Sequence, residues 1–194
     1  MNIPTDEAKS EAIVAYENYL DNLIKNNSDE IFTNKGMEHA PILMSRLFDC
    51  TESEVRMYCE GFKPALIKKG VYWDSLKKYL ESGKSMKVLV EKADWINEEP
   101  FKLLMNERNK RRERNPDDET IQYRIVNNES RKVIGDKILM SHCNFSVFDD
   151  NKFRLEVSPK EYKAYGSFND PVKSKALIET FNDAFGVSQE IMES

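Results

Sequence analysis

Hydrophobic residues recur along this chain with two spacings, one typical of helices and one typical of strands. Apolar positions three or four residues apart predict amphipathic helices at 6–26, about 40–48, 72–80, from 101 onward, and about 171–185. Short runs rich in β-branched and aromatic residues predict strands at 31–33, 55–59, 86–90, 121–126 and 152–157. Helices that alternate with strands in this way predict an α/β sandwich around a central sheet.

The first helix stands apart from this alternation. Residues 1–28 contain an amphipathic helix that ends in the turn Asn26-Asn27-Ser28, and we expect it to be an appended element that contacts a protein partner. Residues 29–194 form the predicted main domain. At 194 residues with 40% hydrophobic content, the chain is long enough to bury one substantial core.

Composition bears on location and cofactors. The longest apolar runs are short, and the N-terminus has no basic region followed by an apolar one, so neither a membrane span nor a secretory signal is predicted and a cytoplasmic location is expected. The chain has three cysteines, an odd number, and their spacing is not that of metal ligands: Cys50, Cys59 and Cys143. We therefore expect buried free thiols, no metal and no cofactor.

A net charge of −5 argues against indiscriminate nucleic-acid binding, although it permits a local basic site. The dense basic run 110–114 is followed by the acidic residues 117–119. One interpretation is a solvated loop whose charges compensate each other. The other is a phosphate-backbone site whose affinity falls steeply with salt.

The segment 141–149 carries the most specific pattern, H-x-N-x4-D, formed by His142, Asn144 and Asp149. Its β-forming residues predict a strand, and strand alternation places His142, Asn144 and Ser146 on one face. A histidine that attacks a phosphodiester needs donors around it that hold the phosphoryl oxygens as charge develops. His142, with Asn144 beside it, is therefore a candidate nucleophile on this face.

With the following G-S-x-N at Gly166, Ser167 and Asn169, this pattern resembles the phospholipase D superfamily, whose motif is H-x-K-x4-D. The resemblance covers about residues 33–185 and implies a phospholipase D-like sandwich, a central mixed sheet with helices on both faces. It implies His142 and Asp149 as catalytic residues. It also implies that Ser167 and Asn169 bind phosphate, in one polar cleft with Asn144.

Asn144 stands where the family has its lysine. Losing one donor of this kind costs roughly 100- to 1000-fold in rate, so we expect phosphodiesterase or nuclease activity to be weak or absent. Arg154 and Glu156 share a face of the predicted strand 152–157. Arg154 is the candidate replacement for the missing positive charge.

One motif per chain also has a consequence for assembly. Members of the superfamily with a single motif pair as homodimers, so the resemblance implies a homodimer here. His39 is a candidate acid in place of the second subunit's histidine, or a helix cap or surface residue. Two functions remain open: a phosphodiester-binding enzyme or remnant, acting on nucleic acid or a small diester, and a non-catalytic interaction or regulatory module.

Overall fold

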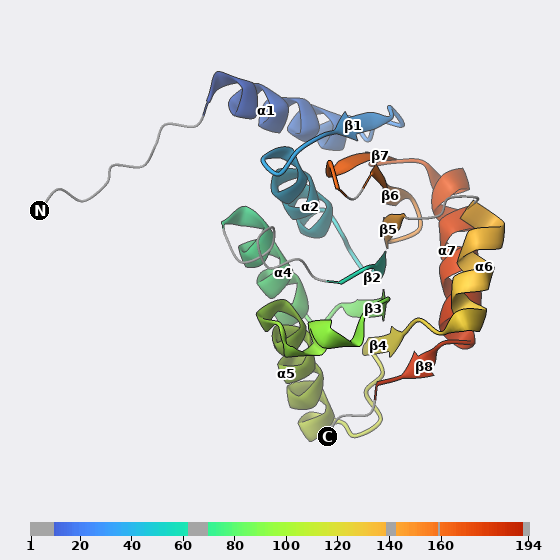
Figure 1. Cartoon of the computed structure of the whole chain (residues 1–194). Helices are drawn as coiled ribbons and strands as arrows, with labels where there is room; N and C mark the ends of the chain where they lie inside the picture. Colours follow the sequence, from blue (N-terminus) through green and yellow to red (C-terminus); the bar gives the residue numbers. More distant parts are fainter. Residues whose placement is uncertain (1–9, 62–69, 139–142, 159, 192–194) are drawn as a thin grey trace, which may run out of the picture.

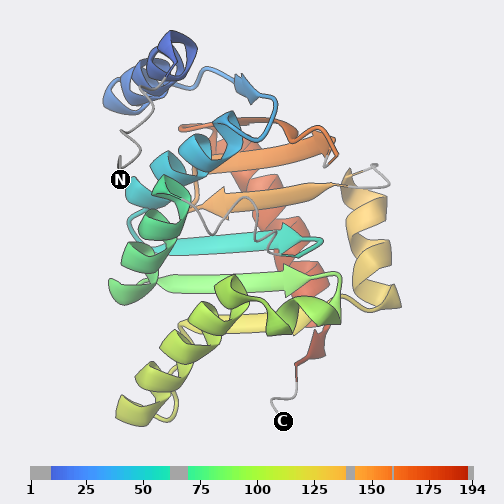
Figure 2. The same ribbon diagram turned by 60° about the vertical axis from the view of Figure 1, so that its left-hand side comes forward.

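The computed structural model describes residues 10–61, 70–138, 143–158 and 160–191. Within them, eight strands form one sheet in the order β1-β7-β6-β5-β2-β3-β4-β8. The strands are β1 (Phe32–Asn34), β2 (Glu54–Cys59), β3 (Ser85–Val90), β4 (Ile121–Ile125), β5 (Asn144–Phe148), β6 (Lys152–Ser158), β7 (Lys163–Ser167) and β8 (Gln189–Glu190). Strands β2, β3 and β4 are parallel, whereas β5 runs antiparallel to β2 (Figure 2). The sheet is therefore mixed.

Helices cover both faces of this sheet (Figure 1). One face carries α1 (Glu11–Lys25), α2 (His39–Asp49), α4 (Val71–Glu81) and α5 (Glu99–Arg114), and the other carries α6 (Asn128–Ile138) and α7 (Pro171–Gly186). A short 3₁₀ helix, η1 (Ala93–Asn97), follows β3. The predicted fold class, a mixed sheet between two helical layers, is confirmed.

Strand alternation divides the core into two hydrophobic clusters, one on each side of the sheet. Phe145 and Val147 of β5 pack with Phe181 of α7, while Phe148 of the same strand packs with Phe48 of α2. Fully burying one such side chain stabilises the fold by about 1.5–3 kcal/mol. The same alternation leaves Asn144 and Ser146 of β5 on the α2 and α4 side.

Helix α1 contributes to the core of the sheet domain. Leu20 is fully buried and Leu23 is 6% exposed, in the same hydrophobic cluster as Leu43 and Leu47 of α2. The N-terminal helix therefore packs on the domain through two leucines one turn apart. Whether it also serves as an interaction element stays a prediction.

The basic run 110–114 differs from the predicted solvated loop because it belongs to α5. Arg111 is only 7% exposed and donates hydrogen bonds to the backbone carbonyls of Leu80 and Lys84 and to the Thr120 hydroxyl. The carbonyl of Leu80 lies in the last turn of α4, where such groups lack helical partners. Arg111 thus ties α5 to the α4–β3 connection.

Gly166 lies inside β7, where sequence analysis assigned no strand. A Cβ atom there would lie 2.1 Å from the Phe153 carbonyl oxygen and 2.6 Å from the Phe32 ring, so no larger residue fits without a shift in the backbone.

None of the helices in the described ranges is long and apolar enough to cross a bilayer.

Candidate functional site

Asn144 opens strand β5 at the edge of the sheet where β2 and β3 end. Its side-chain oxygen accepts a hydrogen bond from the backbone N–H of Glu60 at 2.9 Å, and its nitrogen donates to the Glu156 carboxylate at 2.5 Å. The amide is therefore held on both sides by the protein. It brings no positive charge to this edge.

Arg154 and Glu156 lie beside Asn144 on β6, on the same face of the sheet. Glu156 is the register partner of Asn144, and Arg154 is that of Ser146. Arg154 donates to Glu156 at 3.1 Å, and the two residues are only 8% and 5% exposed. Within the described residues, the Arg154 Nε atom is buried without a hydrogen-bond partner, which leaves one donor of this buried pair unused.

Two tyrosines, on α1 and α4, lie close enough to this group for its charges to affect their pKa. Burial raises the pKa of Tyr16 of α1, and the nearby charge of Arg154 lowers it in part. Burial also raises the pKa of Tyr72 of α4, and electrostatic interactions with Cys59, Arg154 and Glu156 contribute to that pKa. The Tyr16 hydroxyl is buried and has no partner among the described residues. We call Asn144, Arg154, Glu156, Tyr16 and Tyr72 the Asn144 cluster.

His39 lies next to the Asn144 cluster through its contact with Tyr16. It is the first residue of α2, and its ring stacks on the Tyr16 ring with centroids 4.3 Å apart. The structure thus brings His39 within one aromatic ring of the cluster. Its role as an acid stays a prediction.

Lys92 and Glu60 form the exposed rim of the same edge. Glu60 follows β2 directly and Lys92 comes two residues after β3. The two side chains make an ion pair, and Lys92 is 52% and Glu60 34% exposed. Sequence analysis did not select either residue. The signal was available, because ligands of α/β sheets bind outside the carboxyl ends of parallel strands, and Lys92 comes two residues after such a strand.

Cys59 lies beneath the cluster at the end of β2. Burial raises the pKa of its thiol to about 12, and the negative charges of Glu156 and Glu91 act in the same direction. The thiolate is the reactive form of cysteine. Cys59 therefore stays protonated at neutral pH and is a packing residue.

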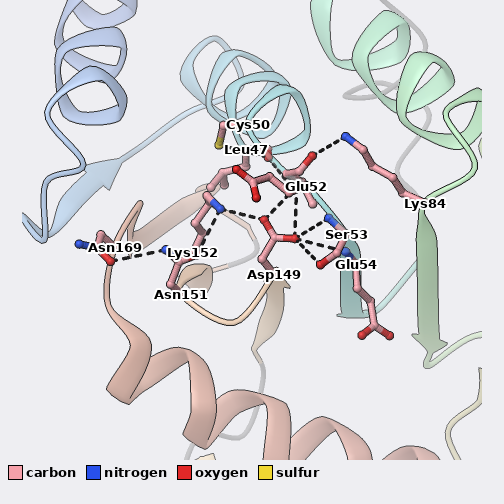
Figure 3. A network of polar contacts seen from close by, with 11 residues as sticks. Leu47, Cys50, Glu52, Ser53, Glu54, Lys84, Asp149, Asn151, Lys152 and Asn169 are labelled. Carbon is pink, nitrogen blue, oxygen red and sulfur yellow. Dashed lines mark hydrogen bonds and ion pairs between the residues drawn. The ribbon is translucent and has the colours of Figure 1, made fainter.

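Asp149 lies at the other end of β5, about 16 Å along the strand at 3.3 Å per residue. Its carboxylate accepts hydrogen bonds from the backbone N–H groups of Glu52, Ser53 and Glu54, from the Ser53 hydroxyl and from Lys152 (Figure 3). The shortest bond from each of the four donors other than the Glu54 N–H is 2.8–2.9 Å. We call this group the Asp149 network.

The electrostatics of Asp149 match this bonding. Burial by itself would raise the pKa of the carboxyl group, but the hydrogen bonds from Lys152, Glu52 and Ser53 outweigh burial and lower it to about 2. Its backbone adopts a positive φ of 56°, which aspartate tolerates better than most residues. Asp149 thus joins the β5–β6 turn to the start of β2.

Ser167 and Asn169 do not share a cleft with Asn144, contrary to the prediction. Ser167 is the register partner of Phe153, on the opposite face from Arg154, and is fully buried. A step of one residue along a strand reverses the face, and Gly166 is the residue that lies opposite Arg154. The Ser167 hydroxyl accepts from the Asn169 N–H at 3.1 Å.

Asn169 lies near the Asp149 end of the sheet. Its side chain donates to the Asn27 carbonyl at 3.1 Å and accepts from Asn151 at 3.5 Å. His142 lies outside the described residues. In the described part of the chain, no three histidine, cysteine or acidic side chains converge as metal ligands do.

Comparison with known proteins identifies the fold. No protein-family model and no curated protein matches this sequence. Nuc from Salmonella typhimurium, a phospholipase D family member, superposes with a TM-score of 0.56 at 13% identity over 84% of this chain and 100% of that chain. TrmBL2, an archaeal chromatin protein with a novel mode of DNA binding, gives 0.56 at 11% over 92% of this chain and 61% of its own.

Polyphosphate kinase from Porphyromonas gingivalis gives a TM-score of 0.54 at 10% identity, over 98% of this chain and 31% of that chain. Identities this low establish architecture and leave substrate open. The mixed sheet, its two helical layers and these likenesses together show that this chain has the phospholipase D-like fold.

Proposed function

We propose that this chain is a degenerate phospholipase D-like protein that holds a phosphate or phosphodiester group at the Asn144 cluster and cleaves it weakly or not at all. One observation carries the proposal. Asn144 occupies the lysine position of the motif, and both ends of its amide are already bonded, to Glu60 and Glu156.

Binding is supported by the unused donors of the cluster. Arg154 Nε and the Tyr16 hydroxyl are both buried without a partner in the described residues, and leaving such a group unsatisfied costs about 1–3 kcal/mol. An oxyanion that accepts from both groups relieves that cost. Lys92, half-exposed at the rim, attracts the same ligand.

Weak cleavage follows from the charge balance. Among the described residues, the two cations placed at the site each face a carboxylate, Arg154 with Glu156 and Lys92 with Glu60. Little net positive charge remains to stabilise the additional negative charge of a transition state. In this proposal His142 is the nucleophile, and Asp149 supports it indirectly by fixing the far end of β5.

The test is hydrolysis of a chromogenic phosphodiester by matched variants. A lysine at position 144 meets the Glu156 carboxylate, so Asn144→Lys alone is expected to gain little, whereas Asn144→Lys with Glu156→Gln restores a free cation. Removing one oxyanion donor changes rates by roughly 100- to 1000-fold, and we expect a gain of up to about that size. Asn109→Lys adds the same charge on the exposed side of α5 and serves as the control.

Two results would contradict the proposal. One is an ordinary enzymatic rate in the wild type that His142→Ala leaves unchanged, because the reaction would then occur elsewhere. The other is an equal gain from Asn109→Lys, which would show that net charge matters and the cluster does not.

The alternative is a non-catalytic interaction or regulatory module. The neutralised cations favour it, as does Val14, which is 43% exposed on α1. Absence of saturable binding of dimethyl phosphate at millimolar concentration selects this alternative.

A homodimer is part of the proposal, because one motif per chain supplies half of a paired site. A two-fold interface is self-complementary and is expected to bury more than about 1,200 Å² in total. Light scattering at micromolar concentration measures the mass directly. A monomer there contradicts the paired-site arrangement.

A further inference from the structure

A separate pocket of about 260 Å³ opens at the β4–β8 edge of the sheet, beside α5. Three arginines line it, Arg108 and Arg112 from α5 and Arg124 from β4. The remaining lining residues are Glu119, Gln122, Tyr123, Glu190 and Ile191. We propose that this arginine pocket binds the phosphate group of an anionic ligand. It shares no residue with the Asn144 cluster.

The two arginines of α5 are held in place before any ligand arrives. Arg108 and Arg112 are one helical turn apart and therefore lie on the same face. The guanidinium of Arg108 lies 4.6 Å from the centroid of the Tyr123 ring. Arg112 donates from Nε to the Asp118 carbonyl at 3.3 Å. This bond uses Nε, the inner nitrogen of the guanidinium group.

Arg124 is anchored from the opposite side of the pocket. One terminal nitrogen donates to the Phe185 carbonyl at 2.8 Å, and the guanidinium lies 4.7 Å from the centroid of the Phe185 ring. Arginines fixed by stacking and by carbonyl bonds lose little rotamer freedom when they bind. The pocket is thus preorganised for an oxyanion.

The carboxylates of this pocket compete weakly for its arginines. Glu190 pairs with Arg124 at 3.3 Å, but its side chain is 80% exposed, and Glu119 is also exposed. Exposed ion pairs of this kind are weak, whereas guanidinium–phosphate contacts are charge-assisted and frequently bidentate. In the Asn144 cluster, by contrast, the competing Glu156 is 5% exposed.

Charge and size define the ligand class. Three arginines and two glutamates leave a formal local charge of +1, in a chain whose net charge is −5. The volume lies just below the usual range for small-molecule pockets, about 300–1,000 Å³. The pocket therefore suits a phosphate or pyrophosphate group, either free or as part of a nucleic-acid strand.

The experiment follows the side-chain Nε–H signals of the arginines by NMR during titration with three probes: inorganic phosphate, pyrophosphate and a single-stranded oligothymidylate. We expect saturable shifts at Arg108, Arg112 and Arg124. Arg112→Gln should weaken binding about tenfold, the effect of one charge-assisted hydrogen bond. Arg112→Lys keeps the charge without the planar fork and should weaken it about threefold.

Lys110→Gln is the matched control, because Lys110 is 62% exposed on the same helix and outside the pocket. We expect it to change affinity less than about twofold, as a distant surface charge does. Preference for the two inorganic anions identifies a free phosphate ligand. Preference for the oligothymidylate, with affinity that falls steeply with salt, identifies a strand. Both results support the pocket.

The proposal fails if none of the three probes shifts these signals, or if Lys110→Gln weakens binding as much as Arg112→Gln. Circular dichroism of each variant shows that it is folded. The backbone amide of Asn144 reports the Asn144 cluster independently in the same spectra, so failure of one site is distinguishable from failure of the other.

Discussion

The two ends of strand β5 hold Asn144 and Asp149, two residues of one sequence motif, in different surroundings. At the Asn144 end, a buried ion pair and a tyrosine leave donors unused, and a half-exposed lysine lies at the rim. At the Asp149 end, five hydrogen bonds from the protein surround the carboxylate.

This difference separates the proposed binding site from a structural network. A carboxylate that accepts backbone hydrogen bonds from three successive residues fixes the entry of β2 into the sheet and has little capacity left for a ligand. Unused buried donors lower stability and are typical of functional sites. Two residues of one sequence motif therefore need not act on the same ligand.

The largest expected effect is on stability at the Asp149 end. Asp149→Ala removes the acceptor of five hydrogen bonds, three of them from backbone N–H groups, and should lower the free energy of unfolding by about 3 kcal/mol. Urea denaturation measures this change. Asp150→Ala, at the exposed neighbouring position, should change it by less than about 0.5 kcal/mol. Equal effects of the two variants would refute the structural role.

The stability of the protein in acid should depend on the ionisation of the same carboxylate. The pKa of Asp149 is lowered from 3.8 to about 2, so its contribution to stability is complete above about pH 4 and is lost as the pH falls through about 2. Thermal melts between pH 5 and pH 2 should show this loss in the wild type. Asp149→Asn should remove that part of the pH dependence, and an unchanged profile would contradict the assignment.

At the Asn144 end, stability and binding should respond in opposite ways. Replacing Arg154 and Glu156 together by methionine removes a buried ion pair, a change that is often neutral or stabilising by about 1–4 kcal/mol. We expect little loss in urea denaturation and complete loss of phosphate binding. A strongly destabilised double variant would mean that the pair is structural, like Asp149.

Lys92→Gln should have the smallest effect. An exposed pair contributes little to stability, so the free energy of unfolding should stay nearly constant while affinity for dimethyl phosphate falls about threefold at low salt. Calorimetric titration at two salt concentrations checks this expectation. Lys77→Gln is the control, since Lys77 makes a similarly exposed pair on α4; an equal loss there would remove Lys92 from the site.

Sequence reasoning could place residues on strands but could not align the strands. Alternation predicted that Asn144 shares a face with Ser146, and Arg154 with Glu156, and the structure confirms both pairs. The family resemblance placed Ser167 in a cleft with Asn144, whereas Ser167 pairs with Phe153 and so lies on the other face of the sheet; that register depends on how β6 and β7 pack. Short or polar elements such as β8 and α6 gave too weak a periodicity to be assigned.

Contacts made by the backbone, or by helices distant in the chain, could not be predicted from the sequence either. The Asp149 network consists mainly of backbone N–H groups of residues 52–54, which any residue except proline would supply. Tyr16 comes close enough for the charge of Arg154 to lower its pKa in part, because α1 packs on the domain through Leu20 and Leu23. Lys92 was predictable, since it follows a strand at the edge where ligands bind.

Titration with dimethyl phosphate, followed at backbone amides by NMR, tests the contrast between the two ends of β5 most directly. We predict saturable shifts for Glu60 and Asn144 and none for Ser53 and Asp149, with the shifts lost in the Arg154→Met, Glu156→Met variant. Shifts confined to Ser53 and Asp149, or no shift at Asn144 at millimolar ligand, would contradict the account.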